Sequence, residues 1–162
     1  MDRATRITVH HSAMYFRNDS PAAAAVQIQQ IQHEHMAGRG YGDIGYHYLI
    51  DPAGRVWQGR PLRWQGAHAS GANNIRNIGV CVLGNFVRGA DGQQPSAAQV
   101  GALRHLIVAL MQDHDIPAGE IFRHSDFKAT ACPGPLLEPV IDRIARELRG
   151  GVPEYRVATP AP

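Results

Sequence analysis

Short runs of β-branched and aromatic residues predict the strands of this chain. The first run is Ile7–His10, and a nearly continuous apolar run at 78–83 is typical of a central strand buried on both faces. The segments 43–51 and 55–59 flank a Pro-Ala-Gly turn, which predicts a hairpin. A last short strand is expected at 121–123.

Apolar residues at helical spacing predict three helices. The first covers 20–38 and begins with a serine and a proline that form an N-cap signal. The second covers 96–114 and begins with a capping-box sequence, and the third covers 135–150. Strands and helices alternate without a regular strand-helix-strand series. The predicted fold is therefore an α/β single domain with a mixed central sheet of about five strands flanked by helices.

Length and composition fit one domain. The chain has 162 residues, of which 44% are hydrophobic, and this is enough for a single core. The expected domain covers 1–151. The remaining residues, 152–162, are rich in proline and show no apolar periodicity. We expect them to form a tail or the start of a linker.

The charge balance argues against two classes of partner. Sixteen Lys and Arg residues against fourteen Asp and Glu residues give a formal net charge of +2, and no basic run is interleaved with aromatic residues. A nucleic-acid surface is therefore not indicated. The N-terminal residues lack the apolar segment of a signal peptide, and no stretch is long and apolar enough to span a membrane. We expect a monomer without membrane insertion and without an export signal of its own.

Candidate metal ligands lie near the C-terminal end, where His124 and Cys132 are eight positions apart and a Pro-Gly turn follows the cysteine. That spacing is too long for a zinc knuckle and suits a loop that bends back on a metal. A third ligand must come from elsewhere, and His10 or His11 can supply it. Strand alternation points these two side chains to opposite faces without deciding between them. Three ligands leave the open position of a catalytic zinc site, whereas a structural site would need a fourth, such as His11 or His68.

Aromatic residues supply candidate walls for a binding site. Tyr46 and His47 lie on opposite faces of the first strand of the predicted hairpin, so either can line a cleft while the other packs. Trp64 and His68 lie in the irregular segment between the hairpin and the central strand. A tryptophan on such a loop can form the wall of a groove or a lid on the core.

Six short segments contain most of these candidate residues and turns. They are Val9–Ala13, Asp43–His47, Asp51–Gly59, Gly66–His68, Asn77–Val80 and His124–Gly134. In this order and spacing the segments resemble a known family, the zinc-dependent N-acetylmuramoyl-L-alanine amidases of type 2. That family includes phage lysozyme-type amidases and animal peptidoglycan recognition proteins. The resemblance implies Zn²⁺ as the cofactor, held by His10 rather than His11.

The resemblance also implies the other ligands and the catalytic residues. His124 and Cys132 complete the zinc site, Tyr46 corresponds to the family's catalytic tyrosine, and His68 to a histidine that lines the same cleft. Phage lysozyme-type members carry a lysine two positions before the cysteine ligand. This chain has Thr130 there, as catalytically active recognition proteins do. A threonine hydroxyl can donate a hydrogen bond to an oxyanion but carries no charge.

The implied function is hydrolysis of the amide bond between the lactyl group of N-acetylmuramic acid and L-alanine of the stem peptide. A zinc-bound hydroxide is the expected nucleophile, with Tyr46 and Thr130 assisting oxyanion stabilisation and Tyr46 or His68 transferring protons. The alternative is a recognition module that binds peptidoglycan without cleaving it. Such relatives have usually lost the cysteine ligand, which this chain keeps.

The expected partner is peptidoglycan or its soluble muropeptides. Trp64, His47, Asn73 and Arg76 are the candidate substrate-binding residues of the groove. We expect the protein to act on the cell wall. Without an export signal, it would reach the wall through release by a phage lysis system, export by a dedicated secretion machine, or as part of a longer chain.

Overall fold

The computed structural model describes residues 3–151, which contain a five-stranded mixed sheet in the order β3-β2-β4-β1-β5. At its centre, β1 (Arg6–His11) runs parallel to β4 (Asn77–Val82). On one side, β2 (Tyr48–Ile50) runs parallel to β4, and β3 (Val56–Gln58) pairs antiparallel with β2 at the edge. On the other side, β5 (Ile121–Arg123) runs parallel to β1. The predicted α/β fold with a mixed five-stranded sheet is confirmed.

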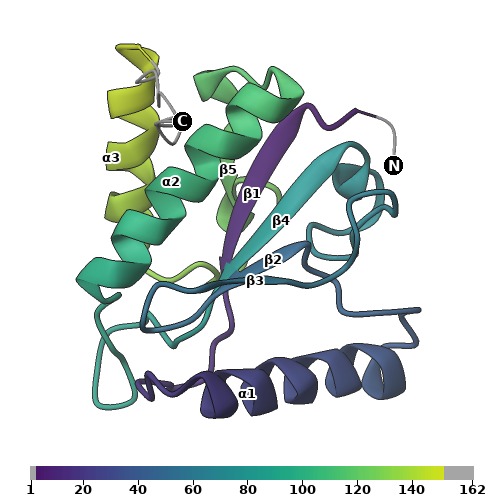
Figure 1. Cartoon of the computed structure of the whole chain (residues 1–162), viewed down its shortest axis with the longest axis vertical. Coiled ribbons are helices and arrows are strands. Elements are labelled where there is room, and N and C mark those ends of the chain that lie inside the picture. The colour runs from purple at the N-terminus through teal and green to yellow at the C-terminus, as the bar shows by residue number, and fades with distance from the viewer. Residues whose placement is uncertain (1–2, 152–162) are drawn as a thin grey trace, which may run out of the picture.

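Three α-helices cover the two faces of this sheet. Two of them, α2 (Ala97–His114) and α3 (Glu138–Arg149), lie together on one side, and α1 (Pro21–His33) lies on the other (Figure 1). Short helical turns connect the remaining elements. They are a π-helical turn at Glu34–Gly38 and 3₁₀ turns at Gly71–Asn74, Ala118–Glu120 and His124–Asp126.

Strand alternation gives the two faces of the sheet different environments. Ile7 and Val9 of β1 join the larger apolar core, which α2 and α3 complete. Thr8 and His10 alternate with them and lie on the α1 side. The apolar cluster there is smaller, and its buried members are Ile31, Ile44, Leu49, Cys81 and Leu83. The α1 side of the sheet therefore keeps room for polar side chains.

The start of α2 follows the predicted capping box. The Ser96 hydroxyl accepts the backbone N–H of Gln99, and the Gln99 side chain accepts the backbone N–H of Ser96, each at 3.0 Å. The same hydroxyl donates to the carbonyl of Pro52 at 2.7 Å. This contact joins the start of α2 to the turn of the hairpin.

The first helix ends differently from the prediction of a continuous helix over 20–38. After α1 the chain forms a π-helical turn at Glu34–Gly38, a local geometry that is frequent at functional sites. His35 in this turn is buried, and its Nδ1 accepts the backbone N–H of Gly45 at 2.9 Å. The turn is thereby joined to the segment that carries Tyr46.

The hairpin is shorter than predicted, because β2 begins only after Tyr46 and His47. A loop packs against the segment before β2. Ala67 donates its N–H to the carbonyl of Gly45, and Arg60 donates its N–H to that of Tyr46. A Cβ atom at Gly45 would lie 2.4 Å from the carbonyl oxygen of Ala67, so only glycine permits this approach.

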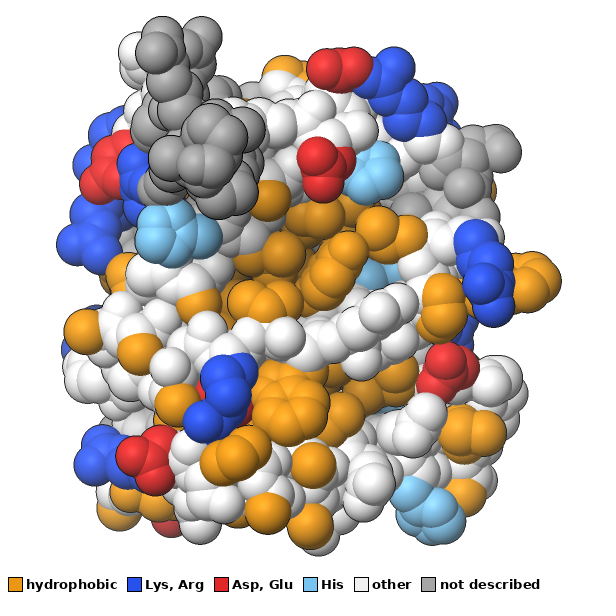
Figure 2. All heavy atoms as spheres, viewed as in Figure 1, with side chains coloured by type: hydrophobic (Ala, Val, Ile, Leu, Met, Phe, Trp, Pro, Cys, Tyr) orange, Lys and Arg blue, Asp and Glu red, His pale blue; other side chains and the backbone are white. Residues whose placement is uncertain are grey.

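The surface seen in the view of Figure 1 has apolar side chains gathered across its middle, with most charged side chains nearer the rim (Figure 2). Within residues 3–151 no helix combines the length and the apolar character needed to cross a membrane. The predicted tail or linker at 152–162 lies outside the described residues.

A buried carboxylate stabilises the hairpin turn. Asp51 is fully buried, and its Oδ1 accepts the backbone N–H groups of Ala53 and Arg55, each at 3.0 Å. Its Oδ2 accepts from the guanidinium of Arg55 at 2.7 Å and from the indole of Trp57 at 2.8 Å. These four donors replace the water that the carboxylate loses on burial.

We predict that Asp51→Asn lowers the free energy of unfolding by about 3 kcal/mol, because the new amide N–H would face buried donors. Urea unfolding measures the change. The control is Asp91→Asn on an exposed loop, which should stay within about 0.5 kcal/mol of the parent protein. Equal unfolding midpoints for the two variants would contradict the prediction.

Candidate metal centre

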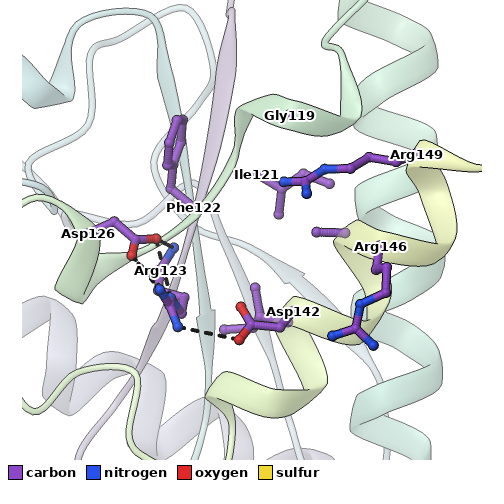
Figure 3. Close-up of a pocket in the computed structure, with 10 residues that line it drawn as sticks. Gly119, Ile121, Phe122, Arg123, Asp126, Asp142, Arg146 and Arg149 are labelled. Atoms are coloured by element: carbon purple, nitrogen blue, oxygen red, sulfur yellow. Dashed lines mark hydrogen bonds and ion pairs between the residues drawn. The ribbon is translucent and has the colours of Figure 1, made fainter.

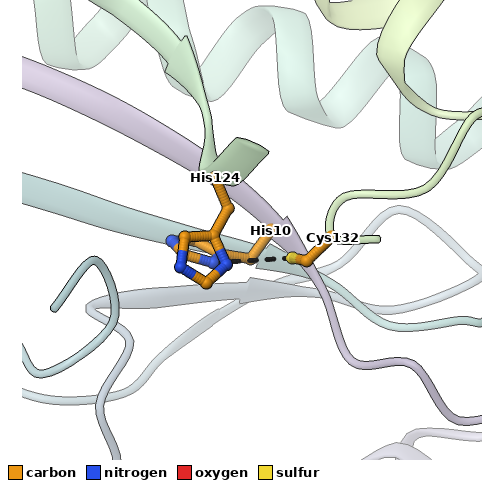
Figure 4. Close-up of side chains that lie close together, drawn as sticks. All are labelled: His10, His124 and Cys132. Carbon is orange, nitrogen blue, oxygen red and sulfur yellow. Dashed lines mark hydrogen bonds between the residues drawn. The ribbon is translucent and has the colours of Figure 1, made fainter. Parts of the chain in front are cut away.

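The three predicted metal ligands converge in the structure. His10 belongs to β1, His124 to the turn after β5, and Cys132 to the following loop; their ligand atoms all lie within 4.8 Å of one another (Figure 4). His10 Nδ1 is 3.7 Å from Cys132 Sγ, and the centroids of the two imidazole rings are 4.4 Å apart. Within residues 3–151, no other group of His, Cys, Asp and Glu is arranged in this way.

The parallel register of the sheet brings the two histidines together. Val9 of β1 pairs with Arg123 of β5, so the next residue on each strand, His10 and His124, emerges at the same end of the sheet. In sheets with helices on both faces, the carboxyl ends of parallel strands are the usual place for a site. Sequence positions more than a hundred residues apart become neighbours through this pairing.

Ion pairs on the side that faces α3 hold the turn that carries His124. The Arg123 guanidinium lies 2.8 Å from Asp126 in the same turn and 3.4 Å from Asp142 in α3 (Figure 3). The backbone N–H of Arg123 also donates to Asp126, at 2.8 Å. These contacts border a cavity of about 400 Å³ between β5 and α3. They hold the turn against α3, while His124 points towards His10 and Cys132.

The loop that carries Cys132 packs closely on the backbone of Phe86. Leu136 donates its N–H to the Phe86 carbonyl at 3.0 Å. Gly134 has a φ of 95°, and a Cβ there would lie 2.5 Å from the same carbonyl oxygen. The predicted Pro-Gly turn therefore needs its glycine. Thr130 accepts the backbone N–H of Cys132 through Oγ1, at 3.2 Å, so its hydroxyl lies in the same loop as the thiol.

Both ring nitrogens of His124 are buried and have no hydrogen-bond partner in the described structure. Buried polar groups without a partner are rare, and an ion is one of the explanations they call for. Burial, with Lys128 as a smaller cause, lowers the pKa of His124 to about 4. Burial and the neighbouring histidines also hold the pKa of His10 well below its usual range. Both imidazoles are therefore neutral ligands at neutral pH.

The Cys132 thiol is the third donor. Burial raises its pKa to about 12, although the backbone N–H of His11 donates to Sγ at 3.4 Å and opposes the shift. The thiol therefore keeps its proton until a cation displaces it. Two neutral imidazoles and one thiolate form a donor set that suits a tetrahedral divalent ion with one open position.

Neither candidate for a fourth ligand points at the cluster. His11 lies on the opposite face of β1, where its Nδ1 accepts the backbone N–H of Phe86 at 3.3 Å. His68 directs Nδ1 at His10 Nε2, 3.0 Å away, and Nε2 at the carbonyl of Asn77, 3.2 Å away. The two residues predicted as alternatives thus have other partners. The geometry favours three ligands and an open position over a closed structural site.

Beside the cluster lies a cavity of about 300 Å³, which is lined by the predicted residues Tyr46, His68 and His124. The Tyr46 ring centroid is 5.1 Å from that of His10. Burial raises the pKa of Tyr46 well above its usual value, so its hydroxyl remains protonated. It can act as a hydrogen-bond donor to a ligand in the cavity.

The same cavity contains residues that the sequence did not single out. Arg39 and Lys128 supply positive charge to its lining, and His35, Tyr41 and Asn74 are among the other residues that line it. These residues come from the π-helical turn, from the 3₁₀ turn at Gly71–Asn74 and from loops, where no periodic pattern exists. The position of His35 at the end of the apolar stripe of the first helix is the one signal that could have indicated its burial.

The predicted substrate-binding residues divide into two kinds. Trp64 is 60% exposed and borders a separate cavity of about 520 Å³, so it is available to a ligand. His47 has no exposed surface; Gly79 donates its N–H to Nδ1 at 3.0 Å, and Nε2 lies 3.1 Å from the carbonyl of Trp64. The structure therefore gives His47 a packing role in place of the predicted substrate contact.

The other two predicted substrate-binding residues do not line the cavity beside the metal ligands. The neighbour of Asn73, Asn74, lines it instead. Arg76 lies before the amino end of β4, and its Nε donates to the carbonyl of Arg3 at 2.8 Å. Because the histidine ligands emerge near the other end of the parallel strands, Arg76 is a poor candidate for contact with a ligand at the cluster.

Comparison with known proteins finds a matching family and related folds. The family model described as N-acetylmuramoyl-L-alanine amidase matches residues 1–135. Peptidoglycan-recognition protein SC2 of Drosophila melanogaster is 35% identical over 127 residues, which cover 78% of this chain and 66% of that protein. The match therefore spans just under two thirds of that relative's length.

Two solved structures share the fold. N-acetylmuramoyl-L-alanine amidase LysC from Clostridium intestinale URNW has a TM-score of 0.70 at 28% identity, covering 88% of this chain and 85% of that chain. The ectodomain complex of peptidoglycan recognition proteins LCa and LCx, bound to tracheal cytotoxin, contains a chain with a TM-score of 0.78 at 26% identity. That match covers 87% of this chain and 82% of the other.

Proposed function

This chain belongs to the N-acetylmuramoyl-L-alanine amidase family, and from that premise we propose that it is a zinc-dependent amide hydrolase. Its substrate is the bond between the lactyl group of N-acetylmuramic acid and L-alanine of the stem peptide in peptidoglycan. The observation that carries the proposal is the cluster of His10, His124 and Cys132, with the unpartnered nitrogens of His124, beside an open cavity.

The cluster fits the ion that the proposal requires. His10 would bind through Nδ1, the atom nearest to the thiol, and His124 and Cys132 would complete the set. A Zn²⁺ ion held there supplies Lewis-acid catalysis and lowers the pKa of a bound water. The backbone N–H of His11 stabilises the Cys132 thiolate once its proton has left.

We propose that two hydroxyl groups, those of Tyr46 and Thr130, stabilise negative charge on the substrate carbonyl. Tyr46 stays protonated because burial raises its pKa, and its ring packs 5.4 Å from that of His35. Thr130 accepts the N–H of Cys132 through its oxygen, so its own proton remains available for donation. Donors fixed before the reaction stabilise an oxyanion without reorganisation.

The charge of the cavity supports an anionic substrate. Lys128 and Arg39 line it, and Arg39 also pairs with Glu34 at 3.2 Å. Stem peptides carry free carboxylates, which suit such a lining. We therefore propose peptidoglycan or a soluble muropeptide as the partner and the cell wall as the place of action. The cytotoxin complex of the related LCa and LCx proteins supports this choice.

The experiment that tests the function is digestion of purified peptidoglycan, with mass analysis of the released fragments. We predict free stem peptides that begin at L-alanine, lost on chelation and restored by Zn²⁺. Cys132→Ala should abolish release, because the remaining two ligands cannot hold zinc. Cys81→Ala, at the other free cysteine, is the matched control and should keep the activity. A protein that binds intact wall and releases nothing would instead be a recognition module.

Tyr46→Phe tests the oxyanion donor. We predict that kcat falls about 10²–10³-fold, because one preorganised donor is lost from the cavity, while the affinity for Zn²⁺ stays the same. Turnover of a soluble muropeptide and competition with a chelator measure the two quantities. Tyr48→Phe, two residues further on at the start of β2 and packed against the larger core, is the control. Equal rates for the two variants would remove Tyr46 from the mechanism.

The pH dependence of zinc binding tests the protonation states of the ligands. Cys132, whose pKa is about 12, must lose a proton on binding, whereas His124, whose pKa is about 4, is already neutral. The apparent zinc affinity should therefore rise about tenfold per pH unit between about pH 6 and 8. Chelator competition at three pH values measures the slope. A slope of zero, or a slope that corresponds to the release of two protons, would contradict the assignment of Cys132 as the one ligand that loses a proton.

A further inference from the structure

A hydrogen-bonded chain runs behind the metal ligands. It begins at the backbone carbonyl of Asn77, which lies 3.2 Å from His68 Nε2. It continues from His68 Nδ1 to His10 Nε2, 3.0 Å away, and ends at His10 Nδ1, which faces the Cys132 thiol. Both imidazoles are buried. The three groups connect the start of β4 with the metal cluster.

The position of each proton in this chain follows from its first member. A backbone carbonyl can only accept, so His68 Nε2 must carry the proton that the Asn77 oxygen receives. A neutral imidazole carries one ring proton, so the Nδ1 of His68 then has a lone pair. His10 Nε2 must then be the donor to His68. With its one ring proton on Nε2, a neutral His10 has a lone pair on Nδ1, the atom that faces the Cys132 thiol.

The His68 ring is held in one place by close packing. A Cβ atom at Gly79 would lie 2.5 Å from His68 Cδ2, and one at Gly66 would lie 2.6 Å from the same atom. Asn74 accepts the backbone N–H of His68 at 2.8 Å through Oδ1. The rings of His68 and His10 meet edge to face, with an interplanar angle of 86°. These contacts leave the imidazole little freedom to rotate or flip.

We propose that His68 is a positioning residue, which fixes His10 in its Nε2–H tautomer and so presents the Nδ1 lone pair to the metal. The role replaces the proton transfer predicted for His68, because both of its nitrogens already have protein partners. The inference rests on the proposed metal centre. It makes the Asn77 carbonyl the group that determines which His10 nitrogen can bind the ion.

This role has a measurable consequence for metal affinity. A partner that holds the second nitrogen of a histidine ligand fixes its orientation and raises its basicity, and loss of that partner costs about 10–100-fold in affinity. His10 without an acceptor at Nε2 would exchange between two tautomers, one of which has its proton on the atom that faces the cluster.

Imidazole ¹⁵N spectra of the metal-free protein test the chain directly. Two-bond ¹H–¹⁵N correlations distinguish protonated from unprotonated ring nitrogens, and we expect protonated Nε2 and unprotonated Nδ1 in both His10 and His68. A protonated Nδ1 on His10 would overturn the proposal. The measurement uses neither zinc nor peptidoglycan, so it remains informative if the proposed enzymatic function fails.

Two substitutions at His68, to Asn and to Leu, test its role as the hydrogen-bond acceptor for His10. The two new side chains are nearly isosteric with each other. Asn retains an oxygen acceptor near the position of Nδ1, whereas Leu has the same branching and no polar atom. We expect Zn²⁺ affinity, measured against a chromophoric chelator, to fall about 10–100-fold in His68→Leu. His68→Asn should stay within about fivefold of the parent protein, because His10 keeps its acceptor. Equal affinities for the two variants would overturn the proposal.

His35→Asn is the matched control for the loss of a buried imidazole. His35 accepts the Gly45 N–H through Nδ1, which the Asn oxygen can replace, and His35 is not one of the three candidate metal ligands. We expect its Zn²⁺ affinity to stay within about twofold of the parent. Thermal unfolding of each metal-free variant checks that it is folded. A loss of affinity in this control as large as in His68→Leu would assign the effect to general disruption and overturn the proposal.

Discussion

The parallel pairing of β1 with β4 and β5 is the constraint on which the site depends. The pairing of Val9 with Arg123 places His10 beside His124. On its other side β1 pairs with β4, whose first residue, Asn77, begins the hydrogen-bonded chain that reaches His10. A one-residue slip of β1 would turn His11 towards the cluster and His10 into the larger core. The ligand set and its support are therefore both consequences of one register.

The two faces of the sheet perform different tasks. The face under α2 and α3 carries the larger apolar core and supplies most of the hydrophobic stabilisation. The face under α1 has a smaller apolar cluster and a group of buried histidines, each of which requires partners. His47 and His68 obtain these partners from backbone groups of Trp64, Asn77 and Gly79. Backbone hydrogen bonds thereby fix the protonation states on which the site depends.

The sequence predicted features that depend on the local order of residues. It could not predict features that depend on contacts between segments distant in the sequence. Period-two alternation correctly placed His10 and His11 on opposite faces, and the capping box correctly located the start of α2. Alternation could not choose between the two histidines; the resemblance favoured His10. The short hairpin and the burial of His47 depend on a loop that packs from elsewhere, and the π-helical turn after α1 depends on the contact of His35 with Gly45. No periodicity in 61–77 indicates that contact.

The free energy of the site bears on whether the cluster of His10, His124 and Cys132 suits an ion. Without an ion, the fold buries two unpartnered nitrogens of His124 and a thiol whose ionisation burial opposes. Each unsatisfied buried polar atom costs about 1–3 kcal/mol. An ion that binds the folded chain and not the unfolded chain offsets this free-energy cost by mass action. The cluster is therefore understandable as a metal centre and has no evident purpose as packing.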